Sequence, residues 1–322
     1  MKILTLNIHS SHYENENRKL DDLVEGILRE MPDLIAIQQA NQSATARAMH
    51  PCLLTGLYDL PGGVVIREDN LAAQLAFRLR ETGMNCSWIW LPVCLNERDQ
   101  DAGIAILSLK KQIRNADVIP ISHNRDYYSP KARKALGVRL EGMTDWFYTL
   151  QADAWEDEAE PFSNQLNMLN CCVASKRAYT SVWLLGDFNA PAVVRGESYD
   201  AMLYSDWHDT FLFAACKDDG ITVPEIPGIW RSKLPNTMHR GVRQDYVWCS
   251  RRQRIRSSYV IFNGARGKVV SDHFGRLVET EGDARSGYCF FQPNLGFYIN
   301  CTPPSILWAP RPFFRPGRLR FY

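Results

Sequence analysis

The chain has 322 residues, of which 45% are hydrophobic and 23% charged, the composition of an ordinary globular protein. This length suffices for one large domain or two small ones with a sizeable core. The formal net charge of +1 excludes bulk attraction to nucleic acid or to an anionic membrane, so a phosphate-bearing partner must be attracted by a local site.

The beginning of the chain does not read as an export signal. Residues 1–10 contain one lysine and a short apolar stretch interrupted by threonine, less than a secretory signal requires. No apolar run approaches the length of a membrane span. The nine cysteines are an odd number without CxxC spacing, which indicates neither a zinc site nor a disulfide framework. These features predict a cytoplasmic protein without a membrane span.

Hydrophobic periodicity predicts a strand, a helix and a strand at the start of the chain. Ile3 to Asn7 and Leu34 to Gln38 are short apolar runs, and between them Leu20 to Glu30 repeats leucine and isoleucine at helical spacing. Many strands and few helices predict an α/β fold with two packed sheets and helices outside. The later runs of strand length are residues 103–107, 146–150, 182–185, 245–248, 260–262 and 274–278.

Two of these runs adjoin a carboxylate beside a second polar group. The segment LLGDFNAP contains Asp187 and Asn189, and the segment VVSDHFG contains Asp272 and His273. If the two segments meet in one cleft, they supply a carboxylate to orient water, an amide, a metal-ligating carboxylate and a histidine. Hydrolysis of a phosphate ester needs these groups. The alternative is that each pair only closes or caps a strand.

The order of motifs along the chain resembles the endonuclease/exonuclease/phosphatase superfamily. The motifs are LTLNIHS, DLIAIQQANQ, GIAILS, GDFNAP, RQDYVW and SDHFG. The segments EDNLA, WEDEAEPF, NAPAVVRGESYD, DDGITV and VIFNGARGKVVSDHFG are most similar to the bacterial maltose 6'-phosphate phosphatase branch. This resemblance implies a four-layer α/β sandwich of two mixed sheets flanked by helices, as in pancreatic deoxyribonuclease, with the active site at one end of the sheets.

The resemblance implies a bound Mg²⁺, with Mn²⁺ as an alternative. Asn7, Gln39 and Asp272 stand at the positions that would hold the ion. The family pattern has a glutamate as the principal ligand where this chain has Gln39. Since Mg²⁺ prefers anionic oxygen, the neutral amide predicts weakened metal binding.

The resemblance also implies catalytic roles. Asp187 would orient and deprotonate water, and Asn189 would steady the phosphoryl oxygens. His273 would stabilise the developing negative charge or transfer a proton, with Asp245 accepting its other N–H. Gln151 stands where the family has a histidine, and it can donate a hydrogen bond but carries no charge.

Further departures precede the segment GIAILS. The sugar-phosphatase branch shows a histidine, an aromatic residue and a glutamate there, whereas this chain has Cys94, Gln100 and Ala102. With Gln39 and Gln151, five substitutions therefore concentrate on site positions. This pattern predicts an intact fold with altered or weakened chemistry.

Candidate substrate contacts are fewer. Trp155 is a candidate platform for a sugar ring, and Arg195 is expected to pair either with a phosphate or only with Glu197. His9 and His12 are expected to be solvated loop residues.

The chain changes character near its end, which predicts a catalytic-type domain over residues 1–282 and a tail over 283–322. Residues 284–322 contain no Asp, Glu or Lys and are rich in Pro, aromatic residues and Arg. We expect this tail to be poorly ordered or foreign to the family, the alternative being that it covers the sandwich or a partner surface.

Three functions remain open at this stage. The first is a metal-dependent phosphoric-ester hydrolase acting on a phosphorylated sugar such as maltose 6'-phosphate. The second is a catalytically inactive relative with a binding or vestigial role. The third is a nuclease, which the near-neutral charge disfavours.

Overall fold

The computed structural model describes residues 1–9, 16–234 and 240–281. Contacts group Met1–Gly282 into one compact unit, while the tail predicted over residues 283–322 lies outside the described residues. Within the described ranges, none of the helices combines the length and hydrophobicity needed to cross a bilayer. The cysteines in these ranges are free thiols.

The first of two mixed β-sheets has eight strands in the order β11-β13-β14-β1-β2-β5-β3, and β4 also pairs with β5. β1 runs parallel to β2 and antiparallel to β14, so the amino-terminal strand lies in the middle of the sheet. The strands are β1 (Lys2–Asn7), β2 (Leu34–Gln38), β3 (Gln42–Ser43), β4 (Ser87–Leu95), β5 (Gln100–Ser108), β11 (Ala214–Lys217), β13 (Ile255–Ile261) and β14 (Gly275–Thr280).

The second sheet has six strands in the order β10-β12-β9-β8-β7-β6. β8 and β9 are parallel, and β12 lies antiparallel beside β9. The strands are β6 (Ile113–Pro120), β7 (Lys134–Leu140), β8 (Trp146–Gln151), β9 (Val182–Asp187), β10 (His208–Asp209) and β12 (Asp245–Cys249).

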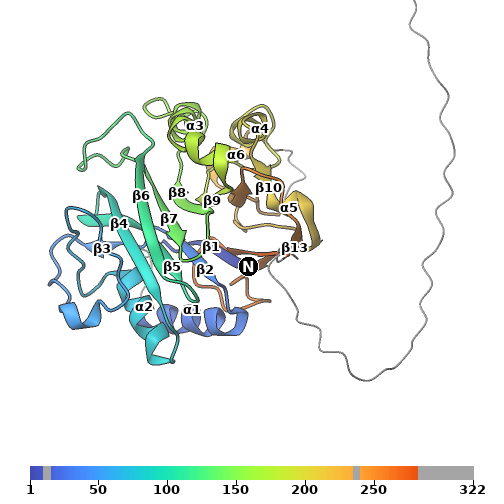
Figure 1. The fold of residues 1–322 in the computed structure, drawn as a ribbon. Helices are drawn as coiled ribbons and strands as arrows, with labels where there is room; N and C mark the ends of the chain where they lie inside the picture. Colours follow the sequence, from blue (N-terminus) through green and yellow to red (C-terminus); the bar gives the residue numbers. More distant parts are fainter. Residues whose placement is uncertain (10–15, 235–239, 282–322) are drawn as a thin grey trace, which may run out of the picture. The chain divides into compact units, whose positions relative to one another are not determined.

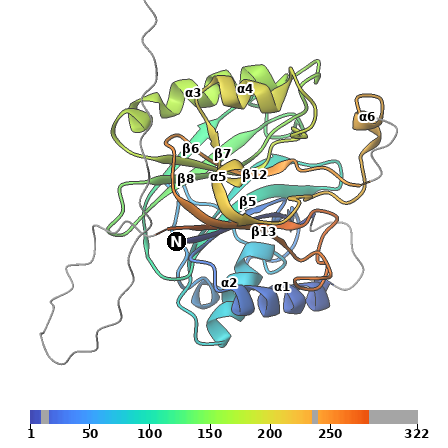
Figure 2. The same cartoon turned by 90° about the vertical axis from the view of Figure 1, so that its right-hand side faces the viewer.

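Helices cover the outer face of each sheet (Figures 1 and 2). α1 and α2 pack on the first sheet, and α3 and α4 pack on the second. The helices are α1 (Glu16–Glu30), α2 (Leu71–Glu81), α3 (Phe162–Tyr179), α4 (Ser198–Tyr204), α5 (Thr210–Phe213) and α6 (Gly228–Arg231), with a 3₁₀ turn η1 (Pro51–Leu53).

Three apolar layers explain why the strands are nearly continuous apolar runs. In β2, Leu34 and Ala36 face the space between the sheets, whereas Ile35 and Ile37 face α1 and α2. β9 likewise buries Leu185 between the sheets and Leu184 against α3. A strand buried on both faces has no polar face, so its sequence does not alternate. The predicted four-layer sandwich is confirmed.

Each strand and helix that the sequence predicted is present in the structure, with differences at its ends. The helix expected over residues 20–30 begins earlier, at Glu16, and the run expected over 260–262 is the end of the longer strand β13. The strands β3, β4, β6, β7, β10 and β11 and the helices α2 to α6 were not predicted.

Candidate active site

The pairing of strands in the second sheet places polar residues side by side at one end of the sandwich. Asp187 pairs with Gln151 across β9 and β8, and with Asp245 across β9 and β12. In the first sheet Asn7 pairs with Gln38 at the ends of the parallel strands β1 and β2. The ends of the two sheets meet where the Asn7 amide nitrogen lies 3.1 Å from the Asp187 carboxylate.

Asp187 is a buried carboxylate held by several donors. It accepts hydrogen bonds from the Asn7 amide, from Gln151 Nε2 at 3.3 Å and from the backbone N–H of Asn189 at 2.9 Å. Burial raises the pKa of Asp187, against the lowering charge of His273. A carboxylate with a raised pKa is a stronger base, which suits it to take a proton from water.

Gly186 allows this strand end to form. Its φ is 149°, and a Cβ there would lie 2.0 Å from the carbonyl oxygen of Leu150 on β8. Only glycine permits such a close approach. Asn189 then adopts a left-handed φ of 45° and donates its side-chain amide to the carbonyl of Ala152 at 2.8 Å, which fixes the amide at the rim of the site.

His273 and Asp245 form a buried pair beside Asp187. His273 Nδ1 lies 3.0 and 3.1 Å from the two oxygens of the fully buried Asp245 carboxylate. The carboxylate therefore accepts a hydrogen bond from Nδ1–H and leaves Nε2 directed away from it. Burial lowers the pKa of His273, but the charge of Asp245 and this hydrogen bond outweigh burial and raise the pKa to about 10. An imidazolium at neutral pH can stabilise negative charge on a phosphoryl group.

Two hydroxyl groups that the sequence analysis missed hold these residues in place. Ser271 Oγ donates to the carbonyl of Asn7 at 2.7 Å and accepts the backbone N–H of His273 at 3.2 Å. Thr222 Oγ1 accepts the backbone N–H groups of Gln244 and Asp245, both at 3.2 Å. No periodic signal reveals such contacts, because each joins segments that are distant in the chain.

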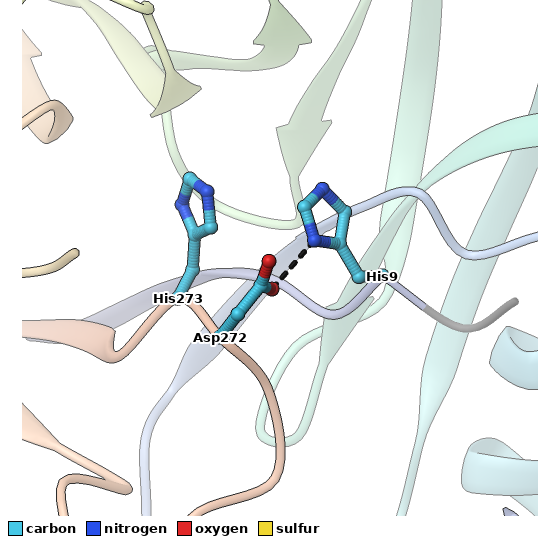
Figure 3. Close-up of side chains that lie close together, drawn as sticks. All are labelled: His9, Asp272 and His273. Atoms are coloured by element: carbon cyan, nitrogen blue, oxygen red, sulfur yellow. Dashed lines mark hydrogen bonds and ion pairs between the residues drawn. The ribbon is translucent and has the colours of Figure 1, made fainter. Parts of the chain in front are cut away.

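His9 also belongs to the site, so the expectation of a solvated loop residue is wrong. Its Nδ1 lies 2.5 Å from Asp272 Oδ1, and its side chain is only 17% exposed. Figure 3 shows the rings of His9 and His273 on either side of Asp272, and their centroids are 5.2 Å apart. The pKa of Asp272 is lowered, because the hydrogen bond and charge of His9 outweigh the opposing effect of burial.

These groups line an open cavity of about 820 Å³. The lining includes Gln151, Asp187, Asn189 and His273 together with the largely apolar loop of residues 223–228. Among the lining residues that the structure describes, none is a lysine or an arginine. The cavity therefore suits a small substrate better than a long polyanion.

A smaller cavity of about 40 Å³ shares Gln151 with the first one. Four of the five departures meet at this smaller cavity, together with two basic side chains. Lys134 Nζ donates to the carbonyl of Pro92 at 2.9 Å, and Arg133 pairs with Asp153 at 2.7 Å. The cavity is lined in part by Gln39, Cys94, Ala102, Gln151, Arg133 and Lys134.

The expected magnesium ligands do not fit that ion well. Gln39 lines the smaller cavity as a neutral amide, Asn7 directs its amide nitrogen to Asp187, and Asp272 is paired with His9. Only one carboxylate remains in a set from which Mg²⁺ would require anionic oxygens. Mixed groups that could hold a divalent metal are His9, Asp272 and His273, and also Asp187, Asp245 and His273, each with ligand atoms within 4.8 Å of one another.

The other sequence candidates lie elsewhere. Gln100 Oε1 accepts the side-chain amide of Asn96 at 3.2 Å. Trp155 is partly buried against the core beneath α3 and is not among the residues lining the larger cavity. Arg195 pairs with Asp200 at 2.6 Å, so its expected pairing with Glu197 is wrong. Glu197 instead pairs with Lys233.

Comparison with known proteins places this geometry in context. No family model matches the chain, and no curated protein matches it. An endonuclease/exonuclease/phosphatase family protein from Leptotrichia buccalis has 26% identity and a TM-score of 0.74, with 88% of this chain and 100% of that chain covered. This structural neighbour supports the endonuclease/exonuclease/phosphatase superfamily that the motif order predicts.

Two further structures extend the likeness at the level of the fold alone. A mannosyl-6-phosphatase from Bacteroides thetaiotaomicron has 14% identity and a TM-score of 0.59, covering 88% of this chain and 100% of that one. A truncated TDP2 from Caenorhabditis elegans has 13% identity and a TM-score of 0.52, covering 86% and 96%. These structures share the fold that the motif order predicts for the endonuclease/exonuclease/phosphatase superfamily.

Proposed function

We propose that this chain is a divalent-metal-dependent phosphomonoesterase that acts on a small phosphorylated sugar. The observation that carries the proposal is a buried carboxylate, Asp187, facing the His273–Asp245 pair at the base of an open cavity. The three residues each place one side-chain atom within 4.8 Å of the others, so they can act on one phosphoryl group.

The chemistry follows from the charge of each group. Asp187, with its raised pKa, orients a water molecule and accepts its proton as the water attacks phosphorus. His273, held as an imidazolium by Asp245, stabilises the negative charge that develops on the phosphoryl oxygens. A divalent ion near Asp272 would neutralise further charge on the phosphate. Phosphoryl transfer depends mainly on positioning and electrostatics of this kind.

A small sugar phosphate fits the cavity better than nucleic acid does. The cavity volume of about 820 Å³ lies in the range of small-molecule sites. Its described lining has no lysine or arginine to follow a phosphate backbone, and the net charge of the whole chain is only +1. The mannosyl-6-phosphatase among the structural neighbours shows that a protein with this fold acts on a phosphorylated sugar.

The test is phosphate release from maltose 6'-phosphate, glucose 6-phosphate, mannose 6-phosphate and nicked DNA, measured with Mg²⁺ and with Mn²⁺. We expect a sugar phosphate to be the best substrate and Asp187→Ala to reduce the rate by at least about a thousandfold. Asp59→Ala, at an exposed loop position away from the cavity, is the matched control and should leave the rate unchanged. Cleavage of DNA alone would reject the sugar phosphate in favour of a nuclease.

A second candidate is a catalytically inactive binding protein. It is favoured by the meeting of Gln39, Cys94, Ala102 and Gln151 at one cavity, since these residues replace the charged groups that the superfamily pattern expects. Under this alternative the native chain releases no phosphate from any of the four substrates, but it still binds a sugar phosphate in a calorimetric titration.

A further inference from the structure

His9 and Asp272 form a mixed nitrogen and oxygen group at the mouth of the larger cavity. His9 follows the end of β1 with a left-handed φ of 42°, which turns its side chain toward Asp272. Figure 3 shows the His9 ring directed at the Asp272 carboxylate, with His273 on the other side. Asp272 is 54% exposed, so its carboxylate can rotate and adjoining positions are open to water.

The side-chain amide oxygen of Asn7 is a third candidate ligand atom. Its amide nitrogen donates to Asp187, while its amide oxygen lies 3.4 Å from the backbone nitrogen of His9. The carbonyl of Asn7 is itself held by Ser271 Oγ, which also lies 3.1 Å from Asp272 Oδ1. These contacts orient Asn7, as the partners of metal ligands commonly do.

The separation of the two principal atoms is close to what a shared ion requires. Neighbouring ligand atoms around an ion at ~2.1 Å lie roughly 3 Å apart. The His9 Nδ1 to Asp272 Oδ1 distance of 2.5 Å therefore needs to open only slightly, which rotation of the exposed carboxylate allows. His273 is already engaged with Asp245 and keeps its own hydrogen bond.

The chemistry of these ligands selects among ions. An imidazole nitrogen with one carboxylate suits divalent transition metals, for which affinity rises from Mn²⁺ towards the later metals of the first row. Mg²⁺ prefers a set of oxygen ligands, and the neutral Gln39 contributes no charge. We propose that His9 and Asp272, with the amide oxygen of Asn7, bind a first-row transition-metal ion in place of the magnesium that the superfamily pattern implies.

This inference deepens the proposed function, because it identifies the metal of the same site, but its test requires no turnover. Co²⁺ is titrated into the metal-free protein, and the visible absorption of bound Co²⁺ is recorded. His50 and Cys52 lie 2.9 Å apart at the surface and form a competing soft site, so every protein in the series carries Cys52→Ser.

We expect Co²⁺ to bind and Mg²⁺ to compete weakly. Removing a group that only orients a ligand costs roughly 10–100-fold in affinity, so His9→Ala, which removes a ligand, should cost at least as much. Asp272→Asn should weaken Co²⁺ binding in the same way. His123→Gln is the matched control, because this exposed histidine lies outside the site, and its Co²⁺ spectrum should be unchanged.

The thermal unfolding midpoint of each variant establishes that it is folded. Co²⁺ binding by folded His9→Ala with the native affinity and spectrum overturns the proposal. Absence of Co²⁺ binding by the Cys52→Ser parent overturns it as well. A chain that binds Co²⁺ through His9 but releases no phosphate would instead reject the proposed hydrolysis and leave the metal site standing.

Discussion

The two cavities that meet at Gln151 differ in the charges that surround them. The larger cavity is lined by the carboxylate of Asp187 and by His273, which is hydrogen-bonded to Asp245. The smaller cavity has the neutral amides of Gln39 and Gln151 where the superfamily pattern has a carboxylate and a histidine. It is also lined by two basic side chains, Arg133 and Lys134. The departures from the superfamily pattern thus gather at the smaller cavity, whereas the carboxylate and the histidine of the larger cavity are those that the motif order predicts.

The largest effect is expected from removing the charge of His273 in the larger cavity. His273→Gln removes the imidazolium but keeps a polar side chain of similar size. We expect phosphate release to fall by about 10²–10⁴-fold, the usual contribution of a positioned acid or base. The rate is measured at saturating substrate with the same metal as the native chain. His123→Gln, an exposed histidine elsewhere, controls for general effects, and an equal loss in both variants would contradict the assigned role.

A carboxylate introduced into the smaller cavity should strengthen the binding of Mg²⁺. Gln39→Glu adds a carboxylate to the smaller cavity, where the nearby charges of Lys134 and Arg133 make an anion favourable. We expect Mg²⁺ to bind about tenfold more tightly, within the range measured for tuning a metal site. The measurement is a calorimetric titration with Mg²⁺. Gln100→Glu, at the departure that does not line this cavity, is the comparison variant and should change Mg²⁺ affinity little.

Thr222 stabilises the backbone that carries Asp245 beside the larger cavity. Thr222→Val keeps the shape of the side chain but removes the oxygen that accepts the N–H groups of Gln244 and Asp245. Leaving buried donors unsatisfied should cost about 1–3 kcal/mol in the free energy of unfolding. Denaturant unfolding measures this cost. Thr55→Val is the control, because that hydroxyl is exposed; equal stabilities of the two variants would show that the Thr222 contacts are dispensable.

A salt bridge at the opposite end of β1 from the site provides a reference that should affect stability alone. The Glu30 carboxylate accepts hydrogen bonds from Arg266 at 2.7 and 2.5 Å, which lowers the pKa of Glu30 against the opposing effect of burial. A lowered pKa in the folded state means that the stabilisation is present above the ordinary value of 4.5 and is lost as the pH falls through the lowered value.

Glu30→Gln should therefore reduce the dependence of stability on pH below about pH 4.5 without changing catalysis. Because Arg266 is 37% exposed, solvent screening limits the effect to roughly 1 kcal/mol. Thermal unfolding midpoints between pH 3 and 7 test it. If the native chain and Glu30→Gln lose stability in parallel as the pH falls, the salt bridge is not responsible.

Most of the strands that the sequence predicted are buried on both faces, although β4 and β7 are also largely buried and were not predicted. β2 and β9 are continuous apolar runs because each faces two core layers, and such runs stand out in a sequence. β6, at the edge of the second sheet, was missed because Arg114, Asn115 and Asp117 interrupt it. An edge strand is only partly covered, so its composition resembles that of a loop.

The polar residues of the site were predictable where they adjoin these apolar runs. Asp187 and Asn189 end β9, and Asp245 begins β12, so their strand positions followed from local pattern. Their association required the register of the second sheet, which places Asp187 opposite Asp245. His9 had no local signal, since its partner Asp272 lies 263 residues away along the chain.

The class of fold, the resemblance to the superfamily and the residues at the ends of the buried strands could all be predicted from the amino-acid sequence. These follow from hydrophobic periodicity and motif order, which are properties of short segments. The tertiary structure was needed to show that His9 contacts Asp272 and that Ser271 and Thr222 support the site. It also shows that four residues line one cavity, namely Gln39, Cys94, Ala102 and Gln151. Such contacts arise when two sheets pack and bring distant loops together, and no single segment encodes that geometry.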